Sequence, residues 1–328
     1  MSYLAKVIPY IVLFCLNTQA IASQDPLPSW NDTELKKSIL NYVSDVTEQS
    51  NELFQPAEKR IAVFDNDGTL WNEKPVYIHL QAVFHSLNQQ LESDPTLANR
   101  QPWATIASGK PDPSHYVQMF SQESFGLESI IEQLVGAPYL GMTSKDYRAL
   151  NKAFLSNWKH PKYKVGYQGL TYQPMKELVN YLQSKQFKVY IYTADEGDFL
   201  RPLAEELYNI PPENVFGSAF KHDLTFEGGK GVLTRSSRLV WFNNWANKVE
   251  LIQRTFGDTV PLIAVGNSNG DEHMLHYTAS FGGMSLWLHH DDEQREDKYD
   301  KHTDKLQQLT EKEQIKQINM SKDWNTVF

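Results

Sequence analysis

The chain has 328 residues, of which 41% are hydrophobic and 22% are charged, and its formal net charge is −9. This is the composition of an ordinary globular protein, long enough for one large domain or two smaller ones. The acidic balance and the lack of a Lys/Arg run predict no nucleic-acid partner. An anionic ligand would therefore have to be held by local groups and a metal rather than by the overall field of the protein.

The first 22 residues have the pattern of a secretory signal peptide. The apolar run 7–16 is followed by Ala20 and Ala22, the small residues that a signal peptidase requires. A membrane span needs about 20 apolar residues, so we expect cleavage, no stable membrane association afterwards, and a periplasmic or secreted bacterial protein. Cys15 is the only cysteine, and the cleaved product would have neither a disulfide nor a thiolate nucleophile.

The spacing of apolar residues predicts a helix over 33–54, with Asn31 or Asp32 as its N-cap, inside an N-terminal helical segment 23–58. The region 76–185 is mainly helical in pattern and is interrupted by prolines. An insert of this length is too long for an ordinary crossover between strands. We therefore predict that it is a helical cap.

Short apolar runs alternate with helical patterns in the remaining segments, 59–75 and 186–328, which we assign to a catalytic core. Strands are predicted at 61–64, 187–192, 214–217, 262–266 and 285–288, helices at 197–208 and 248–256, a hairpin within 219–242, and a charged helix and a last extended piece after residue 300. This alternation predicts an α/β fold with a parallel sheet and right-handed crossovers.

The first core strand leads directly into two carboxylates, Asp65 and Asp67, followed by Gly68 and Thr69. Open α/β sheets place their ligands at this carboxyl edge. Side chains two residues apart in an extended segment point the same way, so this pair can share a divalent cation or divide nucleophilic attack and proton transfer. A plain Asx turn is the alternative. A calcium loop is excluded, because its glycine would stand at the sixth position and not the fourth.

The segment 65–69 resembles the DxDGT motif that opens the haloacid-dehalogenase-like superfamily of aspartate-nucleophile phosphatases. The resemblance extends over most of the chain, including Trp71 and the stretches 172–175 and 289–292, and it is closest to an exported, phosphoserine-phosphatase-like bacterial branch. It implies a Rossmann-like core with a cap at the first insertion position. It also implies a Mg²⁺ cofactor and a small phosphomonoester substrate, and it says nothing of the oligomeric state.

The same resemblance implies roles for particular residues. Asp65 would be the nucleophile and Asp67 the general acid and base, and this second aspartate disfavours dehalogenase chemistry. Thr193, with Ala194, would hold the phosphate at the end of a strand, although Thr193 could instead cap the following helix. The lysine of the motif would be Lys248, with Lys230 in the glycine-rich hairpin as the alternative.

The loop 266–271 departs from the common acidic form of the superfamily, because Asn267 stands at its second position and Asp271 at its sixth. The predicted metal ligands are Asp65, Asp67 through its backbone carbonyl, Asn267 and Asp271. An asparagine still offers an oxygen to Mg²⁺ but removes one negative charge. A catalytically silent protein that binds a phosphorylated ligand therefore remains an alternative.

The cap sets the substrate, and its sequence is rich in aromatic residues. A few of them could form a cage for a quaternary ammonium, which would make the protein a phosphocholine-selective phosphatase, although a broad small-monoester activity is favoured. The candidates are Trp103, Tyr116, Tyr139, Trp158, Tyr163, Tyr167 and Tyr172. The stretch 289–292 could bind a metal, but neighbours on a strand point to opposite faces, so we expect a polar loop there.

Overall fold

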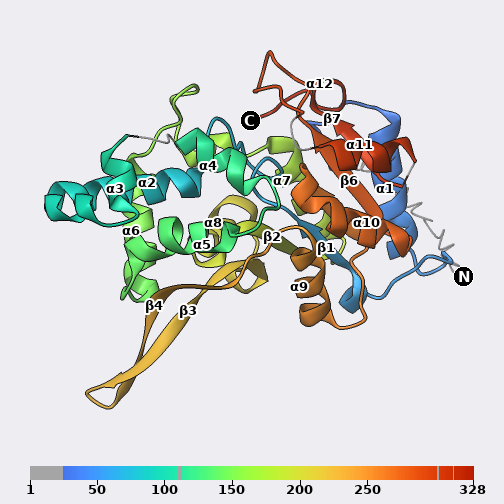
Figure 1. The fold of residues 1–328 in the computed structure, drawn as a ribbon. Helices are drawn as coiled ribbons and strands as arrows, with labels where there is room; N and C mark the ends of the chain where they lie inside the picture. Colours follow the sequence, from blue (N-terminus) through green and yellow to red (C-terminus); the bar gives the residue numbers. More distant parts are fainter. Residues whose placement is uncertain (1–24, 110–112, 301–302, 313) are drawn as a thin grey trace, which may run out of the picture.

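The computed structural model describes residues 25–109, 113–300, 303–312 and 314–328 (Figure 1). The predicted signal peptide lies outside these residues, as does Cys15, so cleavage and export remain predictions that N-terminal sequencing of protein from its native host would test. Among the described residues, no helix combines the length and the apolar character that a bilayer crossing needs.

The centre of the molecule is a seven-stranded sheet in the order β4-β3-β2-β1-β5-β6-β7. Its strands are β1 (Ile61–Phe64), β2 (Lys188–Glu196), β3 (Val215–Glu227), β4 (Lys230–Trp241), β5 (Ile263–Gly266), β6 (Met284–His289) and β7 (Lys316–Asn319). Neighbouring strands are parallel except for the antiparallel pair β3 and β4. The predicted α/β fold is confirmed, and β1 with the first motif lies in the middle of the sheet, where every one of its residues is buried.

Helices cover both faces of the sheet, which explains why its strands read as continuous apolar runs. Alternate residues of β1 enter two separate hydrophobic clusters, Ala62 and Phe64 in one and Ile61 and Val63 in the other. The helices of the first cluster include α1 (Glu34–Thr47), α7 (Gln173–Ser184) and α8 (Gly197–Tyr208), and those of the second are α9 (Ala246–Phe256), α10 (Glu272–Ser280) and α11 (Asp304–Glu311).

The N-terminal helix differs from its prediction at both ends. Its N-cap is Thr33, whose side chain accepts a hydrogen bond from the backbone of Lys36. Asn31 was predicted for this position, but its side chain donates instead to the carbonyl of Lys322. The helix ends at Thr47, earlier than the predicted residue 54.

The insert between β1 and β2 is largely helical, as predicted. It contains α2 (Ile78–Ser93), α3 (Trp103–Ala107), α4 (Pro113–Phe120), α5 (Leu127–Ile131), α6 (Ser144–Asn157) and α7, with short 3-10 and π segments between them. Helix α7 contacts β2 and α8 and therefore covers the sheet, although the predicted cap range 76–185 includes it. The exact division into cap and core remains a prediction.

The pair β3 and β4 forms a long hairpin that reaches away from the sheet beside the cap helices (Figure 1). Its turn is made by Gly228 and Gly229, both with positive φ, as the sequence predicted. The strand predicted at 214–217 is only the start of β3. The stem of the hairpin pairs with the cap, because the backbone of Arg235 donates to Met142 and accepts from Gly141.

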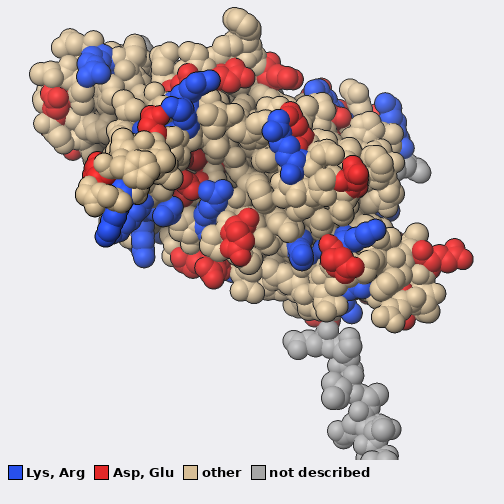
Figure 2. All heavy atoms as spheres, turned by 90° about the horizontal axis from the view of Figure 1, so that it is seen from below, with Lys and Arg blue, Asp and Glu red and all other residues tan. Residues whose placement is uncertain are grey.

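The surface carries charges of both signs. Figure 2 shows Lys and Arg side chains interspersed with Asp and Glu over the face seen from below. An even mixture of this kind produces no strong field of one sign over that face.

Candidate active site

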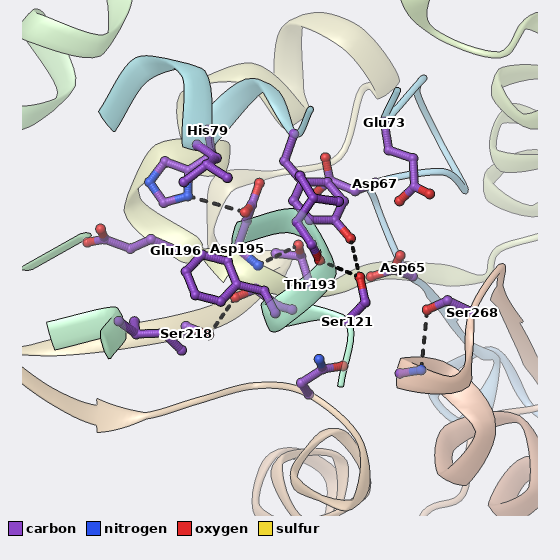
Figure 3. Close-up of a pocket in the computed structure, with 18 of the residues that line it drawn as sticks. Asp65, Asp67, Glu73, His79, Ser121, Thr193, Asp195, Glu196, Ser218 and Ser268 are labelled. Atoms are coloured by element: carbon purple, nitrogen blue, oxygen red, sulfur yellow. Dashed lines mark hydrogen bonds and ion pairs between the residues drawn. The ribbon is translucent and has the colours of Figure 1, made fainter. Parts of the chain in front are cut away.

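A cavity of about 410 Å³ lies at the carboxyl edge of the sheet, between the strand ends and the cap (Figure 3). Most of the residues predicted to act on a substrate line it, namely Asp65, Asp67, Thr193, Ala194, Lys248 and Asp271. The strands β1, β2 and β5 end here side by side, which brings together segments far apart in the sequence. Asn267 is not among the lining residues.

Lys248 lies between two carboxylates at the bottom of the cavity. Its Nζ is 2.7 Å from Oδ1 of Asp65 and 2.6 Å from Oδ1 of Asp271. The side chain is nearly fully buried, whereas Lys230 is exposed at the hairpin turn. The geometry therefore selects Lys248 from the two predicted lysines.

Asp67 lines the cavity beside Asp65, and its carboxyl group has a buried partner. Nε1 of Trp71 donates to its Oδ1 over 2.9 Å, which fixes the carboxyl group. Burial, together with the neighbouring Asp195, raises the pKa of Asp67 well above its usual range. Burial also raises the pKa of Asp195 to about 6, although its hydrogen bond with Asp67 acts in the opposite direction. Both carboxyl groups therefore bind a proton more readily than a carboxyl group in water does.

Asp195 was not assigned a role from the sequence. Its carboxyl group also lies 3.2 Å from Nδ1 of His79 on α2 (Figure 3). Nε2 of the same ring is 3.1 Å from the hydroxyl of Tyr147. Burial lowers the pKa of His79 to about 4, so the ring is neutral. The only signal in the sequence was an acid two residues after Thr193.

The end of β2 is tied to the hairpin by a buried ion pair. Glu196 accepts two hydrogen bonds from the guanidinium of Arg235, and both residues are almost fully buried. The same guanidinium lies 4.0 Å from the ring centre of Tyr147 in the cap. Core, hairpin and cap are therefore connected at one point beside the cavity.

Thr193 is held in a position to contact a ligand. Its Oγ1 accepts a hydrogen bond of 3.0 Å from the backbone N–H of Asp195. A hydroxyl that accepts from the backbone still has its own proton to donate. The side chain lines the cavity, so this proton is available to a phosphate oxygen.

The loop 266–271 is braced by its own acid. Oδ2 of Asp271 accepts from the backbone of Asn267 over 3.0 Å and of Ser268 over 3.1 Å. The amide of Asn267 accepts from the hydroxyl of Thr69 over 3.4 Å and donates to Tyr299 over 3.5 Å. The described contacts of the Asn267 side chain therefore brace the loop after β1.

The stretch 289–292 also supports the first motif. Nε2 of His290 donates to the carbonyl of Gly68 over 2.7 Å, and its Nδ1 is 3.0 Å from Glu296. Although burial opposes it, the charge of Glu296 raises the pKa of His290, so the imidazolium form is favoured. This buried ring fixes the backbone beside Asp67, and it is not a metal ligand in this arrangement.

The donor set at the cavity bottom has the chemistry of a magnesium site. The carboxylates of Asp65 and Asp271 are hard oxygen donors, as is the Asp67 carbonyl that the resemblance implies. Burial and the charge of Asp271 raise the pKa of Asp65 well above its usual range, although Lys248 opposes this. A divalent cation would offset this buried negative charge. Across the described residues, however, no group of three or more His, Cys, Asp or Glu forms a ready cluster for an ion.

The opposite side of the cavity carries a set of apolar side chains, and polar ones such as His79 on α2, Gln118 on α4 and Ser121 lie among them. The apolar residues come from α2, α4, the end of α5, the following π segment, β3 and the position after β4: Leu80, Val83, Val117, Phe120, Ile131, Val135, Phe220 and Phe242. None of the aromatic residues predicted for a quaternary-ammonium cage is among the described residues that line the cavity. The cage, as predicted, is therefore not formed by those residues.

No protein-family model and no curated protein matches the chain. A conserved protein of unknown function from Anaerococcus prevotii DSM 20548 matches with a TM-score of 0.53 and 16% identity, over 87% of this chain and 91% of that one. A protein with unknown function from Bordetella pertussis Tohama I matches with a TM-score of 0.50 and 12% identity, over 80% and 98%. These likenesses show a shared fold.

A phosphoserine phosphohydrolase-like protein from Francisella tularensis subsp. tularensis SCHU S4 also matches, with 16% identity over 76% of this chain and 99% of that one. Its TM-score of 0.38 is too low to support an argument by itself. The observed α/β fold is the one that the resemblance implied, and Asp65, Asp67, Thr193 and Lys248 all line the cavity.

Proposed function

We propose that the protein is a Mg²⁺-dependent phosphomonoester hydrolase of the haloacid-dehalogenase-like type, acting on small phosphorylated metabolites. The observation that carries the proposal is the arrangement of Asp65 and Asp67. One carboxylate is held 2.7 Å from a buried lysine, and burial raises the pKa of the other at the same cavity edge. A nucleophile beside a general acid is the pair that this chemistry requires.

In the first step, an oxygen of Asp65 attacks phosphorus and the bond from phosphorus to the alcohol oxygen breaks. Asp67 gives its proton to that oxygen, so a neutral alcohol leaves and an aspartyl-phosphate remains on Asp65. In the second step, Asp67 takes a proton from water, whose oxygen attacks the phosphoryl group and releases inorganic phosphate and the Asp65 carboxylate. Thr193 and Lys248 bind the phosphoryl oxygens as charge moves between them.

Magnesium would be held by the carboxylates of Asp65 and Asp271, with the carbonyl of Asp67 and the amide of Asn267 completing the set. When bound, it would neutralise charge on the phosphate and on Asp65. Asn267 requires the largest adjustment, because its amide now contacts Thr69 and Tyr299.

The test is a phosphate-release screen over many monoesters, with Mg²⁺ and with EDTA. We expect turnover that EDTA stops and that added Mg²⁺ restores. Full activity in metal-free buffer would contradict the metal assignment. Binding of phosphomonoesters without any release of phosphate would instead support the alternative of a catalytically silent binding protein.

A further inference from the structure

The two sides of the cavity differ in chemistry, and this difference bears on the substrate. The groups that would act on a phosphate lie at the strand ends, at one side of the cavity. The alcohol part of a bound monoester must then extend toward the other side. That side presents apolar side chains from α2, α4, α5, the following π segment and the hairpin region, namely Leu80, Val83, Val117, Phe120, Ile131, Val135, Phe220 and Phe242, with uncharged polar groups such as Gln118 and Ser121 among them.

The charged residues of the lining are mostly acids. Beyond the catalytic groups, the cavity is lined by Glu73, Asp195 and Glu196, and the only further cation among the described lining residues is Lys74. Nζ of Lys74 is 2.8 Å from Glu73 and lies 4.0 Å from the ring centre of Tyr299, so it already has partners. The described lining contains no arginine, since Arg235 pairs with Glu196 behind it.

A second anionic group on the substrate would therefore be desolvated without a partner and close to carboxylates. Burial of an unpaired charge is costly, and like charges increase that cost. An apolar body would instead be desolvated against apolar side chains, with a gain of roughly 0.8 kcal/mol for each buried methylene, or a factor of about four. The cavity volume of about 410 Å³ accommodates a small ligand of this kind.

We propose that the preferred substrate is a monoester of a single phosphate whose alcohol part has an apolar surface and carries no negative charge. This inference rests on the proposed phosphatase function and narrows its substrate class. It disfavours phosphorylated acids.

The experiment measures kcat/KM for propyl phosphate, hexyl phosphate and 6-phosphonooxyhexanoate, with the full chain and Mg²⁺. The last compound is hexyl phosphate with a distant carboxylate in place of its terminal methyl, so the reactivity of the leaving group is preserved. We expect hexyl phosphate to exceed propyl phosphate by about tenfold or more. We expect the carboxylate compound to fall below hexyl phosphate by a similar factor.

The matched variants are Val83→Thr in the apolar wall and Val43→Thr as a control in α1. Both valines are fully buried, but only Val83 lines the cavity. Val83→Thr should lower the ratio of hexyl to propyl phosphate about threefold, whereas Val43→Thr should leave it unchanged. Because the ratio is taken within one variant, it does not depend on the folded fraction.

Equal or better turnover of the carboxylate compound, or no gain from propyl to hexyl phosphate, would overturn the inference while leaving the phosphatase function intact. If none of the esters in the broad screen released phosphate, the proposed function would fail instead. The ligand class would then be decided by calorimetric affinities for hexyl phosphate and its carboxylate analogue. Tighter binding of hexyl phosphate would support the inferred ligand class, and tighter binding of the carboxylate analogue would exclude it.

Discussion

The cavity has a charged floor, formed by Asp65, Asp67, Thr193, Lys248 and Asp271, and an apolar wall, formed by the cap and the hairpin. The floor residues are fixed by hydrogen bonds to backbone groups and to each other, as when Asp271 accepts from its own loop. The wall residues are held by packing alone. This difference indicates that reaction chemistry and substrate choice can be changed separately, which the following predictions examine.

The largest effect is expected at the floor, from Asp65→Asn. The change removes the nucleophile but preserves the shape of the side chain, so turnover should fall by more than about a hundredfold. Phosphate release is the measurement, with Asp323→Asn as the control because Asp323 is another buried aspartate, far along the chain and outside the cavity lining. Retention of most of the activity would remove Asp65 from the chemistry.

A smaller effect is expected from Trp71→Phe, which removes the donor to Asp67 and keeps an aromatic ring. Loss of one buried hydrogen bond costs about 1.5 kcal/mol, so kcat should fall about tenfold. The dependence of kcat on pH should shift as well. Trp30→Phe is the control, since its indole donates to a backbone carbonyl outside the lining over 2.9 Å. Equal losses in both variants would show a purely structural effect.

The variant Asn267→Asp tests whether Asn267 lies beside the metal together with the floor residues. If Asn267 lies beside the metal, the added charge should raise Mg²⁺ affinity several-fold, because the charge of the ligands tunes binding of hard cations. Calorimetric titration of the metal-free protein at fixed pH measures this. An unchanged affinity with a lower melting temperature would mean that Asn267 only braces the loop.

The smallest effect is expected at His79, which lies on the cap helix α2 and contacts Asp195. Its pKa is about 4 in the fold against 6.5 when unfolded, so its neutral form is favoured by folding. This contribution is present above pH 6.5 and is lost as the pH falls toward 4. The melting temperature of the unmodified protein should therefore fall more steeply over that range than that of His79→Gln. His85→Gln, at an exposed position of the same helix, should behave like the unmodified protein.

The floor residues could be nominated from the sequence because each of them follows a recognisable element. Asp65 and Asp67 directly follow an apolar run, Thr193 stands where another one ends, and Asp271 closes a loop after a third. Lys248 was favoured over Lys230 from its place one helix before that loop, and its contacts with Asp65 and Asp271 agree. The end of β2 was placed too early, because the residues after Thr193 include two acids and do not look apolar.

The groups that contact and support the floor residues could not be predicted from the sequence. His79 and Asp195 are 116 residues apart, and His290 and the carbonyl of Gly68 are 222 apart. Buried hydrogen bonds of this kind leave no periodic trace in a sequence, because only the folded chain brings the two groups together. The same holds for the pair of Glu196 and Arg235.

The sequence by itself determined the α/β class and the central strand, because local patterns fix where strands end. It also nominated the side chains that stand at those strand ends as the groups for chemistry. Only the tertiary structure decided which side chains form the apolar wall. The aromatic residues nominated from the cap pack elsewhere, while Leu80, Val83 and Phe120 face the cavity. Apolar residues on a helix look alike in sequence, and whether they meet the core or a ligand depends on how the helices pack.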